Sequence, residues 1–330
     1  MTRTKFPRRK FLHLAAGAVA LPAISHIARA QDRYPSRPIK LVVPFAAGGP
    51  TDIMGRLVAQ HLSTALGQQV IVDNRPGAGS TIAGKAVATA APDGYTLMIN
   101  AASTMAIGPT LYPDAGYDPR TSFAPIGYVS NTPYVMITRP QAAQKTLPEL
   151  IAYAKANPGK LNFGIPNGAP PHMIAAWFRN QTGTDIAIVP YRGASTVITD
   201  LMGGQVDLGF ETTSVTLGHV REGKVRALGV LTAARLPEIP DVPTMIEGGV
   251  PDFIAGAWLG LVAPARTPQP IIARLNAELV AGLNSSQMQE RFKLLGAIAD
   301  PGTPEDFAAF MMKEIPKWVS MVKLSGIKPE

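Results

Sequence analysis

A repeated order of apolar strand, glycine-containing turn and amphipathic helix constrains this chain more than any other feature. Residues 39–43 read Ile-Lys-Leu-Val-Val, the turn Pro-Phe-Ala-Ala-Gly-Gly follows at 44–49, and apolar residues then recur at helical spacing up to Leu66. The same order returns with strands at 69–72 and 95–99, which are separated by a turn and by a helix expected to end near Ala91. Strands that alternate with helices in this way build parallel sheets.

A second series of the same kind begins near residues 134–137. Its expected elements are helices at 147–156, 171–182, 194–203 and 214–222, with strands at 161–165, 186–190, 206–210 and 225–231. After a strand at 258–262, further helices are expected near 268–283, 287–295 and 303–324. We therefore predict an α/β chain with two lobes, each an open, mostly parallel sheet flanked by helices.

The last helices most simply pack back on the first lobe. This assigns residues 31–125 together with 251–330 to one discontinuous lobe, and residues 126–250 to the other. About 300 residues beyond a leader are also what two domains of ordinary size require.

The first 30 residues are expected to be a cleaved export signal. Basic residues precede an uncharged stretch at 12–27, and the small-residue pattern Ala-Arg-Ala ends at residue 30. The pair Arg8-Arg9 followed by Phe11-Leu12 indicates a twin-arginine signal, and an ordinary basic leader is the alternative. Either signal predicts a periplasmic protein that is soluble after cleavage.

Charge and cysteine content exclude several classes of function. Six of the 31 Lys and Arg residues, and none of the 23 Asp and Glu residues, lie in residues 1–30, so the net charge of +8 falls to +2 beyond the leader. A near-neutral chain is not expected to bind nucleic acid, which requires a basic face. The absence of cysteine excludes disulfides, thiol nucleophiles and cysteine-ligated metals.

Motifs for cofactors and metals are incomplete. Residues 79–85 imitate a phosphate-binding loop, but Ala86 stands where Ser or Thr must ligate magnesium. The three histidines beyond the leader, His61, His172 and His219, have no metal-binding spacing. We therefore expect no cofactor and no metal.

Three strand-to-helix turns, at 48–49, 167–169 and 192–194, are rich in glycine and backbone N–H groups. In an open α/β sheet such turns gather outside the carboxyl ends of the strands, where ligands bind. Several N–H groups and helix N-termini that face one cleft favour a carboxylate or another anion.

Several motifs together resemble one receptor family. They lie, in order along the chain, at residues 43–52, 74–79, 91–97, 189–193, 200–207, 240–244 and 258–263. The chain is similar to the Bug family, the periplasmic substrate-binding receptors of tripartite tricarboxylate transporters. This resemblance implies a Venus-flytrap (type II-like) periplasmic binding protein whose two lobes close on a small organic carboxylate without catalysis.

The resemblance also implies which residues contact the ligand. Carried over by position, these are Phe45, Gly48, Gly49, Asp52 and Ser103 in the first lobe, and Asn167, Gly168, Ala169, His172, Tyr191, Arg192, Gly193 and Glu211 in the second. The chain departs from the family pattern in three places. Pro170 and Pro171 remove two N–H donors after the 167–169 turn, Glu211-Thr212 replaces the frequent Asp-Asn, and Arg192 stands where Lys is common after the tyrosine.

Individual residues keep alternative readings. Asp52 either binds an amine or bonds its own loop, and His172 either contacts the ligand or braces its loop. Arg192 either pairs with a ligand carboxylate or stays solvated, and Trp258 either walls the cleft or belongs to the core. Phe45, directly after a strand, is expected in the cleft wall.

The leading functional hypothesis is a receptor with a small organic acid as ligand. Its expected partners are the membrane subunits of a tripartite tricarboxylate transporter, or a sensor protein, and the receptor is expected to be a monomer. The alternative is a secreted α/β hydrolase or isomerase that acts on a small organic acid with Asp52, His172 and Glu211.

Overall fold

The computed structural model describes residues 34–166, 169–191 and 194–328. The predicted leader, residues 1–30, lies outside them. The chain divides into a unit of residues 1–36 and a unit of residues 37–330. Every helix and strand named below belongs to the second unit.

One half of the sheet combines strands from both ends of this unit. β1 (Ile39–Val43) pairs in parallel with β2 (Val70–Asn74) and β3 (Thr96–Asn100), and β3 pairs antiparallel with β9 (Gly256–Pro264). The helices and turns of this half, here called lobe 1, are α1 (Pro50–Leu66), η1 (Ala78–Ser80), α2 (Thr81–Ala88), η2 (Ser103–Ile107), α3 (Gly108–Leu111), α8 (Gln269–Leu283), α9 (Ser286–Leu294) and α10 (Pro304–Ser325).

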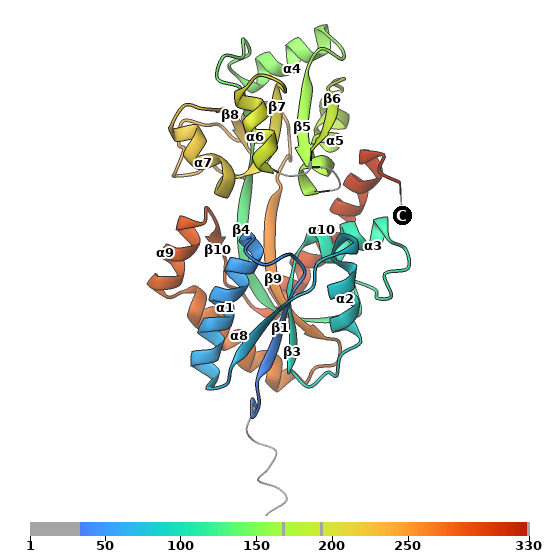
Figure 1. The fold of residues 1–330 in the computed structure, drawn as a ribbon, viewed down its shortest axis with the longest axis vertical. Helices are drawn as coiled ribbons and strands as arrows, with labels where there is room; N and C mark the ends of the chain where they lie inside the picture. Colours follow the sequence, from blue (N-terminus) through green and yellow to red (C-terminus); the bar gives the residue numbers. More distant parts are fainter. Residues whose placement is uncertain (1–33, 167–168, 192–193, 329–330) are drawn as a thin grey trace, which may run out of the picture. The chain divides into compact units, whose positions relative to one another are not determined.

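The other half, lobe 2, is built from the middle of the chain (Figure 1). β5 (Asn162–Pro166) pairs in parallel with β6 (Ala187–Tyr191) and β7 (Leu208–Thr212). The remaining elements are α4 (Leu147–Ala156), α5 (Pro170–Thr182), α6 (Ala194–Met202), α7 (Thr213–Arg221) and β8 (Arg226–Val230). The expected two-lobed α/β fold is confirmed, with helices flanking both halves of the sheet.

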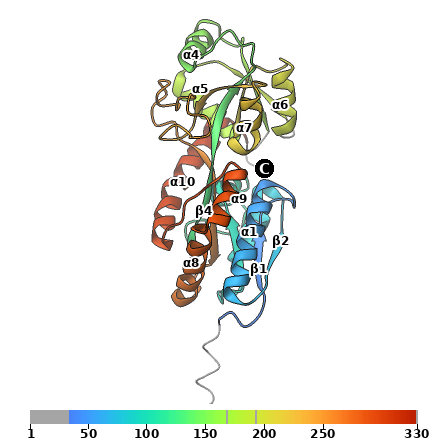
Figure 2. The same cartoon turned by 90° about the vertical axis from the view of Figure 1, so that its left-hand side faces the viewer.

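A single long strand, β4 (Phe123–Thr138), joins the two halves (Figures 1 and 2). Residues 123–133 pair antiparallel with β9, and residues 134–138 pair antiparallel with β7. β8 and the short β10 (Ile298–Ala299) also pair with β4. These antiparallel pairs make the sheet mixed. The boundaries 31–125 with 251–330, and 126–250, stay a prediction.

The start of β4 is the largest difference from the sequence prediction, which placed a strand only near 134–137. Pro125, Gly127 and Pro133 interrupt the apolar alternation that marks a strand, and the register with β9 shifts at 125–127 and 128–130. Pairing with β9, rather than local propensity, therefore holds residues 123–133 extended.

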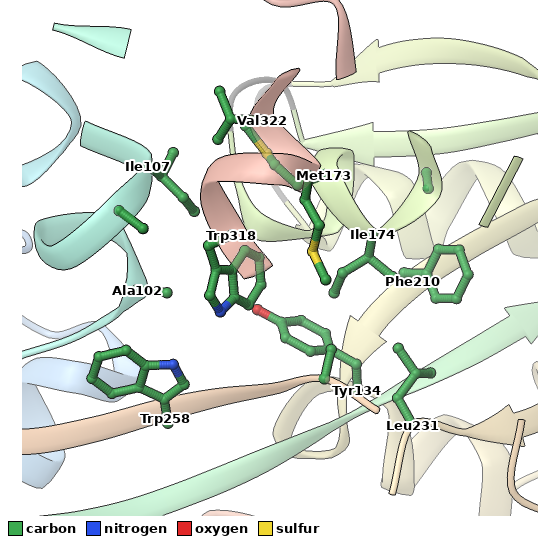
Figure 3. Packing of buried hydrophobic residues seen from close by; sticks show 14 of the residues in the cluster. Ala102, Ile107, Tyr134, Met173, Ile174, Phe210, Leu231, Trp258, Trp318 and Val322 are labelled. Carbon is green, nitrogen blue, oxygen red and sulfur yellow. The ribbon is translucent and has the colours of Figure 1, made fainter. Parts of the chain in front are cut away.

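The C-terminal helix α10 packs on more than lobe 1. It contacts β4 and η2, as the prediction that the last helices return to lobe 1 requires, and it also packs along α5 of lobe 2. Trp318 of α10 lies in one buried cluster with Ile107 of η2 and Met173 of α5 (Figure 3). The core therefore continues from one lobe to the other.

None of the helices among the described residues combines the length and apolar character needed to cross a lipid bilayer.

Candidate functional site

A pocket of about 230 Å³ lies where the carboxyl ends of β1, β3 and β7 meet. Phe45 follows β1, Ser103 follows β3, and Thr212 ends β7, so both lobes contribute to the wall. The lining residues are Phe45, Pro50, Thr51, Met54, Ala101, Ala102, Ser103, Thr132, Tyr134, Pro170, Thr212, Ser214, Gly256, Ala257, Trp258, Leu259 and Trp318. Open α/β sheets hold their ligands at this edge.

The loop between β1 and α1 is held from behind by Asp52. Oδ2 of Asp52 accepts the backbone N–H of Gly48 at 2.8 Å and Nε of Arg56 at 2.9 Å. Oδ1 accepts Nδ2 of Asn74 at 2.8 Å, and the same amide nitrogen also donates to the carbonyl oxygen of Phe45 at 3.0 Å. Gly48 has φ +83°, a conformation that favours glycine.

The same contacts explain the acidity of Asp52. Burial alone would raise the pKa of this carboxyl group, but the hydrogen bonds from Arg56, Gly48 and Asn74 outweigh burial and lower the pKa from 3.8 to about 2. The carboxylate is therefore ionised and committed to its loop. This geometry favours the loop-bonding alternative for Asp52 over direct contact with a ligand.

The segments after β1 and before α2 are linked to Ser103 through the hydroxyl of Ser80. The hydroxyl of Ser80 donates to Oγ of Ser103 at 3.2 Å and to the carbonyl oxygen of Pro44 at 3.4 Å. Ser80 and Ala78 have φ of 76° and 42°, left-handed values that are uncommon outside glycine. Such strain persists where surrounding contacts require it, often beside binding sites.

In lobe 2, hydroxyl groups surround the start of α7. Thr212 is the N-cap residue, and its Oγ1 lies 2.8 Å from Oγ of Ser214. Both residues line the pocket, where Thr132 of β4 adds a third hydroxyl. These groups offer an anion hydrogen bonds without a fixed charge.

Two helices, α1 and α7, begin at the pocket. Gly49 and Thr212 are the N-cap residues of α1 and α7, and neither cap is closed by a side-chain hydrogen bond. Pro50, the first residue of α1, has no N–H, and α5 begins with two such residues, Pro170 and Pro171. The positive ends of α1 and α7 therefore favour a carboxylate in the pocket.

Two tryptophans of the lining share one hydrogen-bond acceptor. Nε1 of Trp258 and Nε1 of Trp318 both donate to Oε2 of Glu314, at 3.2 Å and 2.8 Å. Trp258 is 2% exposed and is also among the lining residues, so it belongs to the core and borders the pocket.

The structure brings some of the predicted ligand residues to the pocket. Phe45 and Ser103 line it, while Gly48, Gly49 and Ala169 lie in the segments that lead into lining residues. Tyr191 instead donates its hydroxyl to Oδ2 of Asp200 at 2.7 Å, and this bond raises its pKa to about 12. Four further predicted contacts, Asn167, Gly168, Arg192 and Gly193, lie outside the described residues.

Glu211 and His172 are buried and are not among the lining residues. Successive side chains of a strand point to opposite faces. Thr212 lines the pocket, so the side chain of Glu211, one residue earlier in β7, is expected on the opposite face. Burial raises the pKa of Glu211 to about 7 and lowers the pKa of His172. Contact of either residue with a ligand stays a prediction.

Sequence reasoning missed several lining residues, namely Thr132, Tyr134, Thr212, Ser214 and Trp318. The run Thr212-Thr213-Ser214 follows a strand and opens a helix, so the strand-to-helix rule could have found it. The other three come from β4 and α10, whose positions depend on tertiary packing.

Two larger hollows lie elsewhere. One of about 410 Å³ lies between α1 and α9, and one of about 480 Å³ lies between α7 and α9. The walls of both contain charged side chains, and the second adjoins the candidate pocket at Ser214, just after the end of β7. The described residues contain no cluster of His, Asp and Glu that could hold a metal ion.

Comparisons with known proteins identify the family of the chain. The sequence profile of the group described as "Tripartite tricarboxylate transporter family receptor" matches residues 54–327. BugT of Bordetella pertussis is 37% identical over 319 residues, which cover 96% of each protein.

Solved structures extend the likeness to the fold. MatC from Rhodopseudomonas palustris, solved with bound malate, is 35% identical with a TM-score of 0.73, and the match covers 88% of this chain and 100% of MatC. An R. palustris protein solved with adipate is 34% identical with a TM-score of 0.77, and the match covers 90% of this chain and 100% of that protein.

Proposed function

The chain belongs to the tripartite tricarboxylate transporter receptor family, and from this membership we propose that it captures a small organic carboxylate between its lobes and delivers it to membrane subunits. The resemblance to the Bug receptors is confirmed, and the chain is a solute-binding receptor of this family. The remaining proposals concern the ligand, its contacts, the partners and the mechanism.

One observation carries the ligand class. Both lobes line the pocket. The N-terminal turns of α1 and α7 form part of its wall, and hydroxyl groups form another part. A carboxylate there receives backbone and hydroxyl hydrogen bonds without a countercharge. The malate and adipate held by two solved relatives are carboxylates of the expected size.

We propose that the protein binds its ligand without converting it. The hydrolase or isomerase alternative requires Asp52, His172 and Glu211 to act together. Asp52 is instead bonded to Gly48, Arg56 and Asn74, and Nδ1 of His172 has no hydrogen-bond partner in the described part of the chain. These contacts hold Asp52 in its loop and give His172 no partner that could activate it, which supports binding without conversion.

The proposed location is the periplasm, after removal of residues 1–30, and the proposed form is a monomer. The proposed partners are the membrane subunits of a tripartite tricarboxylate transporter, with a sensor protein as the alternative. Membership in a receptor family and the leader pattern support these proposals.

Closure of the lobes is the proposed mechanism. A ligand that contacts residues of both lobes, such as Ser103 and Ser214, binds the closed arrangement better and so shifts the population toward it. β4 and β9, which run between the two halves as a paired ribbon, supply the hinge in this proposal.

Solution scattering with added malate or adipate tests this function. We expect a smaller radius of gyration with a binding acid, and the same acid recovered unchanged after hours. Gly49→Val should weaken binding by about tenfold or more through lost charge-assisted hydrogen bonds. It should still fold, because a Cβ at Gly49 meets only the Ala46 carbonyl oxygen, at an ordinary 3.6 Å.

Gly218→Val is the matched control, since Gly218 has open space around it and does not line the pocket. Accumulation of a product would reject the receptor mechanism. Tight binding without a decrease in the radius of gyration would reject closure of the lobes. Unchanged ligand affinity in Gly49→Val would show that the loop between β1 and α1 does not contact the ligand.

A further inference from the structure

Ser80 adopts a backbone conformation that is strained for a serine. Its φ is 76° and its ψ is 4°, which lie in the left-handed region where a Cβ crowds the backbone. Gly79, the residue before it, has a similar φ of 57° without that crowding. Strain of this kind persists where surrounding contacts hold the residue in place, and it gathers at binding sites. The contacts of Ser80 therefore indicate what its side chain does.

The side chain of Ser80 does not cap the helix that follows it. A serine directly before a helix usually accepts an N–H of the first helical turn. Ser80 is the N-cap residue of α2, yet its hydroxyl makes no such bond. The residue is 5% exposed, and its hydroxyl lies 3.2 Å from Oγ of Ser103 and 3.4 Å from the carbonyl oxygen of Pro44. The hydroxyl therefore serves two neighbouring loops instead of its own helix.

Both of these loops reach the candidate pocket. Ser103 lines the pocket, and Pro44 directly precedes Phe45, which also lines it. Ser80 itself is not among the lining residues. In the described part of the chain, Ser80 is the hydrogen-bond partner of the Ser103 hydroxyl. Ser80 can therefore influence a ligand through Ser103 without touching the ligand.

The direction of one proton decides what Ser103 offers to a ligand. A hydroxyl group has one proton to donate and lone pairs that accept. When Ser80 donates to Oγ of Ser103, the proton of Ser103 is available to a carboxylate oxygen in the pocket. When Ser103 instead donates to Ser80, it presents only lone pairs, which a carboxylate does not bind. In the first arrangement each hydroxyl also polarises the next, and this strengthens the bond to the ligand.

We propose that Ser80 is a positioning residue, which holds the proton of Ser103 toward the ligand and so favours a carboxylate over a group that donates a hydrogen bond. This inference rests on the proposed receptor function and deepens it. It assigns the selection of an anion at this part of the wall to a residue outside the lining. The strain at Ser80 accompanies the placement of its hydroxyl between Ser103 and Pro44.

Two substitutions at position 80 separate the hydroxyl from the backbone strain. Ser80→Ala and Ser80→Gly both remove the hydroxyl, but only glycine relieves the left-handed strain. Calorimetry uses whichever of malate and adipate binds the wild-type protein more tightly. We expect both variants to bind this acid about three- to tenfold more weakly than wild type. Ser80→Gly should nevertheless unfold about 1–3 °C above Ser80→Ala. If ligand affinity instead follows the unfolding midpoint, the role of Ser80 is structural and the proposal is wrong.

Ala78→Gly is the matched control for the backbone. Ala78 also has a left-handed φ, 42°, but its side chain is exposed and carries no hydroxyl. This change relieves strain in the same turn and should leave the affinity within about twofold of wild type. A loss of affinity as large as that of Ser80→Gly would mean that added backbone freedom weakens binding, which would overturn the role of the hydroxyl.

A double-mutant cycle tests whether Ser80 acts through Ser103. Ser103→Ala should weaken binding of the acid by about tenfold, since one charge-assisted hydrogen bond is lost. Adding Ser80→Ala to Ser103→Ala should weaken binding by less than about a further twofold, because the hydroxyl that Ser80 orients is already absent. Losses that multiply would show that Ser80 acts independently of Ser103.

The outcomes separate this inference from the receptor function. If malate or adipate binds wild type and Ser80→Ala with equal affinity, Ser80 has no positioning role and the receptor function stands. If neither acid binds the wild-type protein or raises its unfolding midpoint, the proposed carboxylate receptor fails, and the inference that rests on it fails as well.

Discussion

The backbone N–H of Gly48 donates to Oδ2 of Asp52 at 2.8 Å and so joins the glycine turn to the first turn of α1. Replacing Asp52 by Asn leaves some of the donors Gly48, Arg56 and Asn74 without an acceptor. Position 52 is 2% exposed, so the amide nitrogen introduced there would be a buried, unsatisfied donor, which costs about 1–3 kcal/mol, and we expect the free energy of unfolding to fall by that amount. Ligand affinity should fall as well, since the turn loses its support.

Asp93→Asn is the matched control for this change. Asp93 also pairs with an arginine, Arg37, at 2.9 Å, but both side chains are exposed, at 41% and 62%. An exposed pair contributes about 0–1 kcal/mol, so chemical denaturation should show little effect of Asp93→Asn. Equal losses in the two variants would mean that the loop contacts of Asp52 do not stabilise the fold.

Gly260 of β9 has no room for a side chain. A Cβ at this position would collide with the ring of Phe307 on α10, whereas a Cβ at the exposed Gly218 of α7 would meet nothing within 4 Å. We expect Gly260→Ala to destabilise the protein by about 1–3 kcal/mol through overpacking. Gly218→Ala should stabilise it by up to about 1 kcal/mol through helix propensity. Thermal unfolding of both variants measures the difference.

A second glycine lies where the two lobes meet. The hydroxyl of Thr213 donates to the carbonyl oxygen of Gly296 at 2.7 Å, and a Cβ on Gly296 would lie 2.8 Å from the backbone nitrogen of Ser214. Gly296→Ala should therefore displace the start of α7 and weaken binding of the carboxylate ligand by about tenfold, the loss of one charge-assisted hydrogen bond.

Gly326→Ala controls for the backbone effect of that change. Gly326 has φ +72° and Gly296 has φ +64°, so both variants carry similar left-handed strain, but Gly326 has nothing within 4 Å. Calorimetry of the ligand complex should show weaker binding only for Gly296→Ala. If both variants bind the ligand with similar affinity, the contact of Gly296 with the start of α7 does not influence binding in the pocket.

Local patterns predicted most of the fold. Helix 147–156 has the predicted bounds. The hydroxyl of Thr146, the residue directly before the helix, accepts the N–H of Glu149 and so fixes the start of the helix by a local contact. Residues 123–133 escaped prediction because pairing with β9 holds them extended. The helix expected to reach Ala91 ends at Ala88.

The candidate site was predictable where a residue follows a strand directly. Phe45 meets that condition and lines the pocket, whereas Ser103, which also lines it, was expected only from the family resemblance. Trp318 does not, because its position depends on how α10 packs on α5, and a buried tryptophan in an amphipathic helix has the same sequence signature as any core residue. At the end of β7 the strand alternation favours Thr212 over Glu211 as the pocket residue, a distinction that a motif comparison by position does not make.

Burial of Glu211 makes the stability of the protein depend on pH. The side chain is 4% exposed, Oε1 has no hydrogen-bond partner in the described part of the chain, and burial raises its pKa from 4.5 to about 7. Between these two values the folded state binds the proton and the unfolded state releases it. The free energy of unfolding therefore declines as the pH rises from 4.5 to 7, by about 3 kcal/mol in total for this group, and does not recover above pH 7.

Glu211→Gln should remove that decline, because the amide has no charge to bury. Denaturation of both proteins between pH 4.5 and pH 8 measures the effect as a difference, with the variant gaining stability relative to wild type as the pH rises. His172 also contributes to the pH dependence, because burial lowers its pKa and the free energy of unfolding therefore falls as the pH falls below 6.5. This contribution is the same in both proteins and cancels in the difference. In Glu222→Gln, the control, the lost carboxylate is exposed and its pKa is lowered by the hydrogen bond from Lys224, so the decline should persist. A constant difference between wild type and Glu211→Gln over this range would show that Glu211 has an ordinary pKa in the folded protein.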